Sequence, residues 1–101
     1  MTELGGWSEV KPVTLEVIKI CLEVRPIVEK TVETDFTETY IPVVYRSQIV
    51  NGENYLVKVL VDEDGVCVHL NIYQTLPCDG GELSVTGIQY PKPFDDLLIP
   101  F

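Results

Sequence analysis

Hydrophobic residues recur every three or four positions over the first third of the chain and every second position over the rest. Between residues 13 and about 32, the helical spacing forms one stripe of apolar side chains at Val13, Val17, Ile20, Val24 and Val28. Thr14 is a suitable N-cap for a helix that begins just after it. Pro26 lies inside this stretch and has no backbone N–H, so the pattern alone predicts that the helix kinks or divides there.

A second group of apolar residues lies on another flank of the same helix, at Leu15, Ile18 and Leu22. Such a wide apolar arc predicts a helix that is buried on more than one side, as if a curved sheet enclosed it. A contact between two copies of the chain is the alternative explanation. The preceding residues, 1–11, are predicted to form an extended, poorly ordered arm.

Beyond the threonine-rich segment at residues 31–39, apolar and polar residues alternate, which predicts β-strands. The four predicted strands span residues 40–50, 53–61, 66–74 and 82–90. In the third strand, alternate residues from Val66 face one way, while Cys67 and His69 face the other. One helix followed by consecutive hairpins predicts an α+β meander with the helix on one face of the sheet.

Turn signals separate the predicted strands. The Asn-Gly pair at residues 51–52 is a strong hairpin signal, and residues 63–65 connect the second strand to the third. Pro91 and Pro93 are predicted to interrupt the chain after the last strand. The final residues, 96–101, are expected to pack or pair at the edge of the sheet.

Length and charge narrow the class of protein. The 101 residues suit a single domain with one hydrophobic core. Seven basic and sixteen acidic residues give a formal net charge of -9, and no basic run is present, which argues against nucleic acid or an anionic membrane as a partner. The N-terminal residues lack the pattern of a secretory signal peptide, and the apolar runs are too short to span a membrane.

Three cysteines, at positions 21, 67 and 78, cannot all pair with one another, which predicts reduced thiols and a cytoplasmic location. Cys67 and His69 share a strand face and could suggest a nucleophile with its base, or a metal site. Their side chains are expected to project side by side from an open sheet, without a cleft or a third orienting group. Two ligands also fall short of the four of a structural zinc site. We therefore expect no catalytic residue, no metal and no cofactor. Cys21 and Cys67 suit a core, whereas Cys78 lies in a predicted exposed loop.

Three segments that should be exposed are uncharged or apolar. They contain Leu4, Gly5, Gly6 and Trp7 in the arm, Ile49, Val50 and Asn51 at the first hairpin, and Leu76 and Pro77 in the later loop. Alternate turns of a meander lie at the same end of the sheet, so the hairpin and the later loop should be neighbours. A wedge of exposed hydrophobic surface at one end of a small domain predicts a site for a protein partner.

The hairpin carries a specific motif as well. Its five residues are Gln48, Ile49, Val50, Asn51 and Gly52, and the pattern Gln-x-Val-x-Gly resembles the first binding loop of the cystatins, protein inhibitors of papain-like cysteine proteases. Further similarities lie at residues 5–12, 24–30, 54–59, 68–70, 76–77, 86–87, 95–97 and 101. Over essentially its whole length the chain is identified as similar to the stefins, the type 1 cystatins. The resemblance implies a cystatin-like fold, with one long N-terminal helix passing through Pro26 and wrapped by a four- to five-stranded antiparallel sheet.

The resemblance also implies a function and the residues that perform it. It implies a tight, reversible, non-covalent and competitive inhibitor of papain and cathepsins B, L and H. Leu4 and Gly5 would enter the cleft ahead of Gly6, the tip from Ile49 to Asn51 would cover the catalytic groove, and the Leu76-Pro77 pair would rest on its primed side. Gln48 and Gly52 would shape the hairpin. Stefins can exchange the helix and first strand between molecules, so a monomer is expected and a domain-swapped dimer, hinged at residues 48–52, is the alternative.

Three residues depart from the stefin pattern. Asn51 replaces the usual small residue of the first loop, Trp7 is unusual behind the arm glycines, and Cys78 directly follows the Leu-Pro pair. The Asn-Gly turn is expected to survive the first change. Oxidation of Cys78 would be expected to weaken the contact made by the second loop or to link two molecules.

Overall fold

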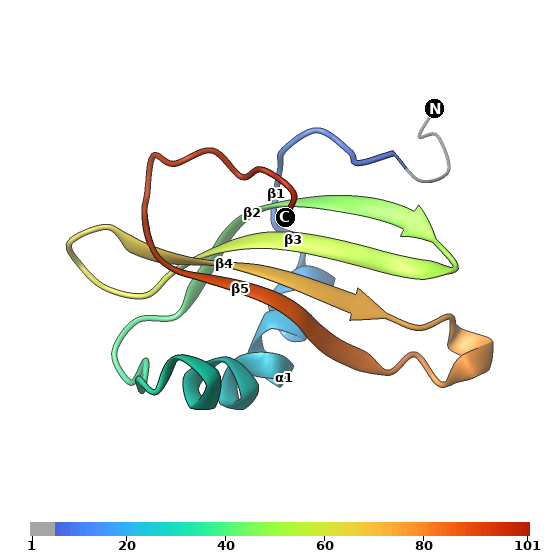
Figure 1. Ribbon diagram of the computed structural model, residues 1–101, viewed down its shortest axis with the longest axis horizontal. Helices are drawn as coiled ribbons and strands as arrows, with labels where there is room; N and C mark the ends of the chain where they lie inside the picture. The colour runs from blue at the N-terminus through green and yellow to red at the C-terminus, as the bar shows by residue number, and fades with distance from the viewer. Residues whose placement is uncertain (1–5) are drawn as a thin grey trace.

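The computed structural model describes residues 6–101 and shows one helix packed on a five-stranded antiparallel sheet (Figure 1). The elements are β1 (Lys11–Pro12), α1 (Leu15–Val32), β2 (Ile41–Val50), β3 (Gly52–Leu60), β4 (Val66–Gln74), the 3-10 helix η1 (Pro77–Asp79) and β5 (Leu83–Pro93). The strands lie in the order β1-β2-β3-β4-β5, so every strand pairs with its neighbour along the chain. This arrangement confirms the predicted α+β, cystatin-like fold.

Helix α1 is continuous over 18 residues, including Pro26. Its first turn is capped by Thr14, whose side-chain oxygen accepts a hydrogen bond of 3.3 Å from the backbone N–H of Val17. The division at Pro26 predicted from the pattern alone is wrong, and the unbroken helix implied by the resemblance is confirmed. Pro26 and Leu22 are both exposed, so the carbonyl that loses its donor lies on the solvent side, where water can replace the bond.

The core lies between one face of α1 and one face of the sheet. The buried residues of the helix are Val17, Ile20, Cys21, Val24 and Val28, and those of the central strands include Val57, Val59, Val68, Leu70 and Ile72. Alternate positions of β3 and β4 thus supply the sheet side of the core, as the period of two requires. Burial without a charged partner raises the pKa of the Cys21 thiol to about 12, which keeps it neutral.

The second apolar flank of the helix is not enclosed. Leu15 is 68% exposed and Leu22 is 49% exposed, on the side of α1 that faces away from the sheet. The prediction of a helix buried on more than one side is therefore wrong. The sheet covers one side only, because the remaining chain after β5 lies against the opposite face of the sheet (Figure 1).

The last strand continues through both of its prolines. β5 runs from Leu83 to Pro93, so the interruption predicted at Pro91 and Pro93 is wrong. β5 is an edge strand, and its pairing with β4 shifts register between Cys67 and His69, opposite the segment that contains Pro91. A proline is tolerated at such a bulge or on an outer edge, where no backbone donor is needed.

The arm pairs with the sheet instead of standing free of it. Lys11 and Pro12 form β1 against β2, and Trp7 forms an isolated bridge with Gln48. The predicted extended conformation agrees with this pairing, but the predicted poor order is wrong for the paired residues. Leu4 and Gly5 lie outside the described residues. From β1 backward, the arm runs along β2 toward the hairpin tip.

The last eight residues, which we term the C-terminal strap (residues 94–101), cross the far face of the sheet. The buried Lys58 ammonium donates to the carbonyl oxygens of Phe94 at 2.6 Å and Asp96 at 2.7 Å. The Arg46 guanidinium donates to the carbonyl of Leu98 at 3.0 Å, and the Leu98 side chain is buried. The strap thus packs over a face of the sheet, held by side chains of β2 and β3, so the predicted placement of residues 96–101 at the edge is wrong.

The strap buries residues that the sequence placed on an open face. Cys67 and His69 are both buried, so the predicted open sheet at this position is wrong, whereas the expectation that Cys67 suits a core is confirmed. Burial raises the pKa of the Cys67 thiol, which disfavours the thiolate that nucleophilic chemistry requires. Burial, followed by the charges of Lys58 and Lys92, lowers the pKa of His69 below its usual 6.5, while Asp96 opposes that shift.

Stability should therefore depend on the protonation of His69. Because its pKa is lower in the folded protein, the unfolded chain binds the proton more strongly, and the free energy of unfolding falls as the pH drops below about 6.5. This one proton contributes at most about 1.4 kcal/mol per pH unit. We expect urea unfolding between pH 8 and pH 5 to show this decline for the wild type and a flatter profile for His69→Gln. Identical profiles would contradict the assignment.

Candidate functional site

Two loops lie side by side at one end of the sheet. The first loop (residues 48–52) joins β2 to β3, and the second loop (residues 75–82) joins β4 to β5 (Figure 1). β3 and β4 are paired where the loops begin, with Glu53 opposite Gln74. The Tyr73 hydroxyl on β4 donates a hydrogen bond to the carbonyl of Asn51 at the hairpin tip. The sheet therefore fixes the two loops relative to each other.

The first loop is an unusually tight turn. Val50 pairs directly with Gly52, which leaves Asn51 at the tip. Gly52 has φ +112, and a Cβ atom built on it would lie 2.5 Å from the backbone oxygen of Gln74 and 2.5 Å from the hydroxyl of Tyr73. Only glycine therefore lets the hairpin pass so close to β4.

The side chains of the first loop divide into two groups. Ile49 is 48% exposed and Asn51 is exposed, so both are available to a partner, while Val50 is half-buried. Gln48 is held by the fold, since its side-chain oxygen accepts a hydrogen bond of 2.8 Å from the Asn54 amide. This division fits the expectation that Gln48 and Gly52 shape the loop.

The second loop is closed by hydrogen bonds between its own backbone groups. The backbone of Gly81 donates to the carbonyl of Leu76 at 3.0 Å, and the backbone of Thr75 donates to Glu82 at 3.0 Å. Within the loop, η1 begins at Pro77. Leu76 and Pro77 remain exposed, as expected of contact residues. The loop therefore presents its apolar pair on a preformed frame.

The Cys78 thiol is exposed within η1, one residue after the Leu-Pro pair. It therefore lies on the surface that the second loop presents. The other two cysteines are buried in the sheet and helix.

A hollow of about 560 Å³ separates the two loops from the start of α1. Its apolar wall includes Ile49 and Leu76, its acidic residues are Glu16 and Glu53, and Tyr55 also lines it. Burial, then the charges of Glu53 and Glu16, raises the pKa of the Tyr55 hydroxyl, which therefore stays protonated. The hollow suits an apolar group that carries a hydrogen-bond donor or a positive charge.

The sequence reasoning missed Glu16, Glu53 and Tyr55. Glu53 directly follows the loop motif and could have been included on that ground. Nothing in the pattern of the chain joins Glu16, in the first turn of the helix, to the hairpin.

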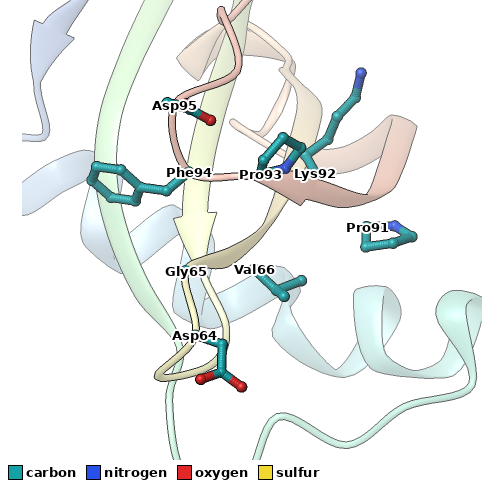
Figure 2. Close-up of a pocket in the computed structure, with 8 residues that line it drawn as sticks. All are labelled: Asp64, Gly65, Val66, Pro91, Lys92, Pro93, Phe94 and Asp95. Carbon is teal, nitrogen blue, oxygen red and sulfur yellow. The ribbon is translucent and has the colours of Figure 1, made fainter.

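A second hollow, of about 450 Å³, lies beside the β3–β4 turn, at the other end of the sheet (Figure 2). Its lining residues are Asp64, Gly65, Val66, Pro91, Lys92, Pro93, Phe94 and Asp95. It contains none of the predicted site residues. Lys92 is paired with Asp96 at 3.1 Å, and this hydrogen bond lowers the pKa of the Asp96 carboxyl.

The arm leads directly to the two loops. The backbone of Ser8 donates to the carbonyl of Ser47 at 2.7 Å, and the Ser8 hydroxyl accepts from the backbone of Ser47 at 3.0 Å. Trp7 then bridges to Gln48, the first residue of the first loop, and Gly6 is half-buried. The described part of the arm thus arrives at the same end of the sheet as both loops.

Neither a metal-binding cluster nor a membrane-spanning helix occurs within residues 6–101. Within residues 6–101, no three side chains of His, Cys, Asp or Glu are grouped to hold a metal ion. Across the same range, no helix has both the length and the apolar character needed to cross a membrane.

The chain resembles several known proteins over nearly its full length. It is 41% identical over 98 residues to cystatin-A of Felis catus, covering 96% of this chain and 97% of that protein. It is 36% identical over 97 residues to leukocyte cysteine proteinase inhibitor 1 of Sus scrofa, covering 96% and 92%. It is 36% identical over 98 residues to stefin-C of Bos taurus, covering 97% and 95%. No family model matches the chain. These similarities show that the chain belongs to the stefin branch of the cystatin family.

Proposed function

We propose that the protein inhibits papain-like cysteine proteases by placing the arm and both loops in the active-site cleft. The observation that supports this most directly is the juxtaposition of the Gln-x-Val-x-Gly hairpin and the Leu76-Pro77 loop, with the arm leading to the same end. One relative is named a cysteine proteinase inhibitor, and the family consists of inhibitors, not enzymes. The binding is tight, reversible, competitive and non-covalent.

The mechanism is steric exclusion by a preformed wedge. Ile49, Val50 and Asn51 cover the catalytic groove, and Leu76 and Pro77 rest on its primed side. Gly6 continues the arm into the cleft, and we assign the contacts ahead of it to the preceding leucine and glycine, as the resemblance implies. Both loops are fixed by hydrogen bonds before binding, so little conformational entropy is lost on docking.

The proposed partners are papain and cathepsins B, L and H, bound by the monomer. The formal charge of -9 favours association with a cleft that has basic residues at its rim, because opposite charge accelerates encounter. We place this activity in the cytoplasm, in keeping with the three free thiols.

The experiment that tests this function is a titration of papain and cathepsins B, L and H with the purified monomer, using a fluorogenic peptide substrate. We expect competitive, reversible inhibition with an inhibition constant of about 1 nM, equivalent to ~12 kcal/mol of binding free energy. Trypsin, a serine protease, should be unaffected. A confirmed monomer that inhibits none of the four enzymes would refute the proposal.

A matched pair of variants tests the placement of the wedge. Ile49→Asp should weaken inhibition about 30-fold, since it buries a charge in the contact. Leu97→Asp changes a side chain that is 73% exposed on the C-terminal strap, against 48% for Ile49, and should leave the inhibition constant unchanged. Equal effects of the two substitutions would place the contact surface elsewhere.

A further inference from the structure

Arg46 joins the two ends of the chain. It lies on β2, where its Nε donates to the carbonyl of Ser8 at 2.8 Å and its Nη1 donates to the carbonyl of Leu98 at 3.0 Å. The guanidinium is half-buried between the arm and the C-terminal strap. Both acceptors are backbone carbonyls, so these two hydrogen bonds do not depend on the side chains of Ser8 and Leu98.

We propose that Arg46 is a positioning residue for inhibition, which fixes the direction of the N-terminal arm by tying it to the C-terminal strap. The proposal rests on the function proposed above, because it concerns how the arm is presented to a protease. Arg46 itself is not placed among the residues that contact the protease.

The bond to Ser8 lies where it can control the arm. The segment proposed to enter the cleft ends at the half-buried Gly6, two residues before Ser8. One residue spans at most about 3.5 Å, so fixing Ser8 limits where the preceding residues can reach. Three hydrogen bonds join Ser8 to β2, two shared with Ser47 and one from Arg46, and only the last comes from a charged donor.

The strap supplies a firm support for the guanidinium. Its acceptor, the carbonyl of Leu98, belongs to a residue whose side chain is buried against the sheet. The same segment is held nearer its start by the two hydrogen bonds from Lys58. Arginine suits this position because its planar head presents donors in fixed relative directions, whereas lysine offers a single ammonium.

A double-substitution cycle separates positioning of the arm from a general structural role. The four proteins are the wild type, Arg46→Gln, a deletion of residues 2–6, and the deletion combined with Arg46→Gln. We expect Arg46→Gln to raise the inhibition constant for papain about tenfold in the full chain, because a charge-assisted hydrogen bond is lost. In the deleted background the same substitution should change it less than about twofold. An equal loss in both backgrounds, or no loss in the full chain, would overturn the proposal.

Two further variants control for stability and chemistry. Val28→Ala removes buried volume from α1, far from the arm, and should lower stability without raising the inhibition constant. Arg46→Lys keeps the charge with fewer directed donors and should lie between the wild type and Arg46→Gln. An inhibition constant for Arg46→Lys equal to the wild-type value would show that the charge alone suffices and would count against the guanidinium geometry.

A second readout keeps this proposal distinct from the proposed function. Amide hydrogen exchange of Ser8 and Ser47 reports the pinning of the arm without any protease. Arg46→Gln should accelerate exchange at both amides, and unchanged protection would overturn the positioning role. If the wild type fails to inhibit while exchange responds as expected, the failure lies in the proposed function and not in the role of Arg46.

Discussion

Gly52→Ala should weaken inhibition about 100-fold, or ~2.7 kcal/mol of binding free energy, while leaving a folded protein. The new Cβ would lie 2.5 Å from the backbone oxygen of Gln74, closer than unstrained contacts allow, so the hairpin must shift. The residue also sits at φ +112, where a side chain adds further strain. The shifted tip would carry Ile49 and Asn51 out of register with the second loop. Inhibition constants for papain and cathepsin L measure the effect.

Gly65→Ala is the matched control for this prediction. Gly65 also has positive φ, +87, but a Cβ there would meet only the Cβ of Phe94, at an ordinary 3.7 Å. It lies in the turn between β3 and β4, away from the two loops. We expect Gly65→Ala to lower stability by about 1 kcal/mol and to leave inhibition unchanged. Comparable losses of inhibition in both variants would mean that backbone strain in general, and not the packing of the tip on β4, limits binding.

Phe36→Ala should produce the largest loss of stability, about 3–5 kcal/mol in the free energy of unfolding. Phe36 lies in the segment that connects α1 to β2, and its side chain is buried. The centroid of its ring lies 6.0 Å from that of Tyr40 and 5.7 Å from that of Tyr90. Its backbone is also fixed, since its N–H donates to the Glu29 carboxylate at 2.7 Å and its carbonyl accepts from Arg25. The side chain thus links the end of the helix to the last strand. Urea unfolding at neutral pH measures the change.

Phe36→Leu tests whether the aromatic contacts or only the filled volume matter. It should cost clearly less than the alanine substitution, because most of the buried volume is retained. Inhibition by the folded fraction of either variant should be unaffected, since Phe36 is absent from the lining of the hollow beside the two loops. A leucine variant as unstable as the alanine variant would show that the ring contacts, and not the volume, carry the stability.

Features set by local physics could be predicted from the sequence. The helix begins where Thr14 caps it, and the ends of the first three long strands differ from the predicted ones by at most one residue. The Asn-Gly pair predicted the position of the first hairpin, although Gly52 pairs with Val50 and Asn51 alone forms the tip. Each of these depends on residues close together in the chain, where capping, periodicity and turn chemistry act directly.

Features set by contacts between distant segments were predicted poorly. Pro91 was expected to end a strand, but an edge position and a bulge remove the need for its missing donor. Leu22 was expected to be buried, yet the sheet covers a single side of the helix. His69 was assigned to an open face because the path of the strap over it depends on Lys58 and Arg46, which lie far away in sequence.

Only part of the candidate site could be predicted from the sequence. The motif predicted the exposed tip, and the apolar Leu76-Pro77 pair predicted a second contact loop. Because alternate turns of a meander lie at the same end of the sheet, the two loops were predicted to be neighbours. The hollow beside the two loops was missed because Glu16 lies on α1 and lines it only when the helix packs on the sheet. The hydrogen bonds that join Ser8 to β2 were missed because Ser8 belongs to no motif and to no periodic pattern.

The pairing of the arm with β2 has a consequence for solubility. β1 covers only two residues of the ten-residue β2, and the contacts of Trp7 and Ser8 shield the rest of that outer edge toward the hairpin. An uncovered strand edge is a template for pairing with strands of other molecules. Proteolytic trimming beyond Ser8 would therefore do more than remove a binding element: it would open a β-edge through which copies of the protein could aggregate.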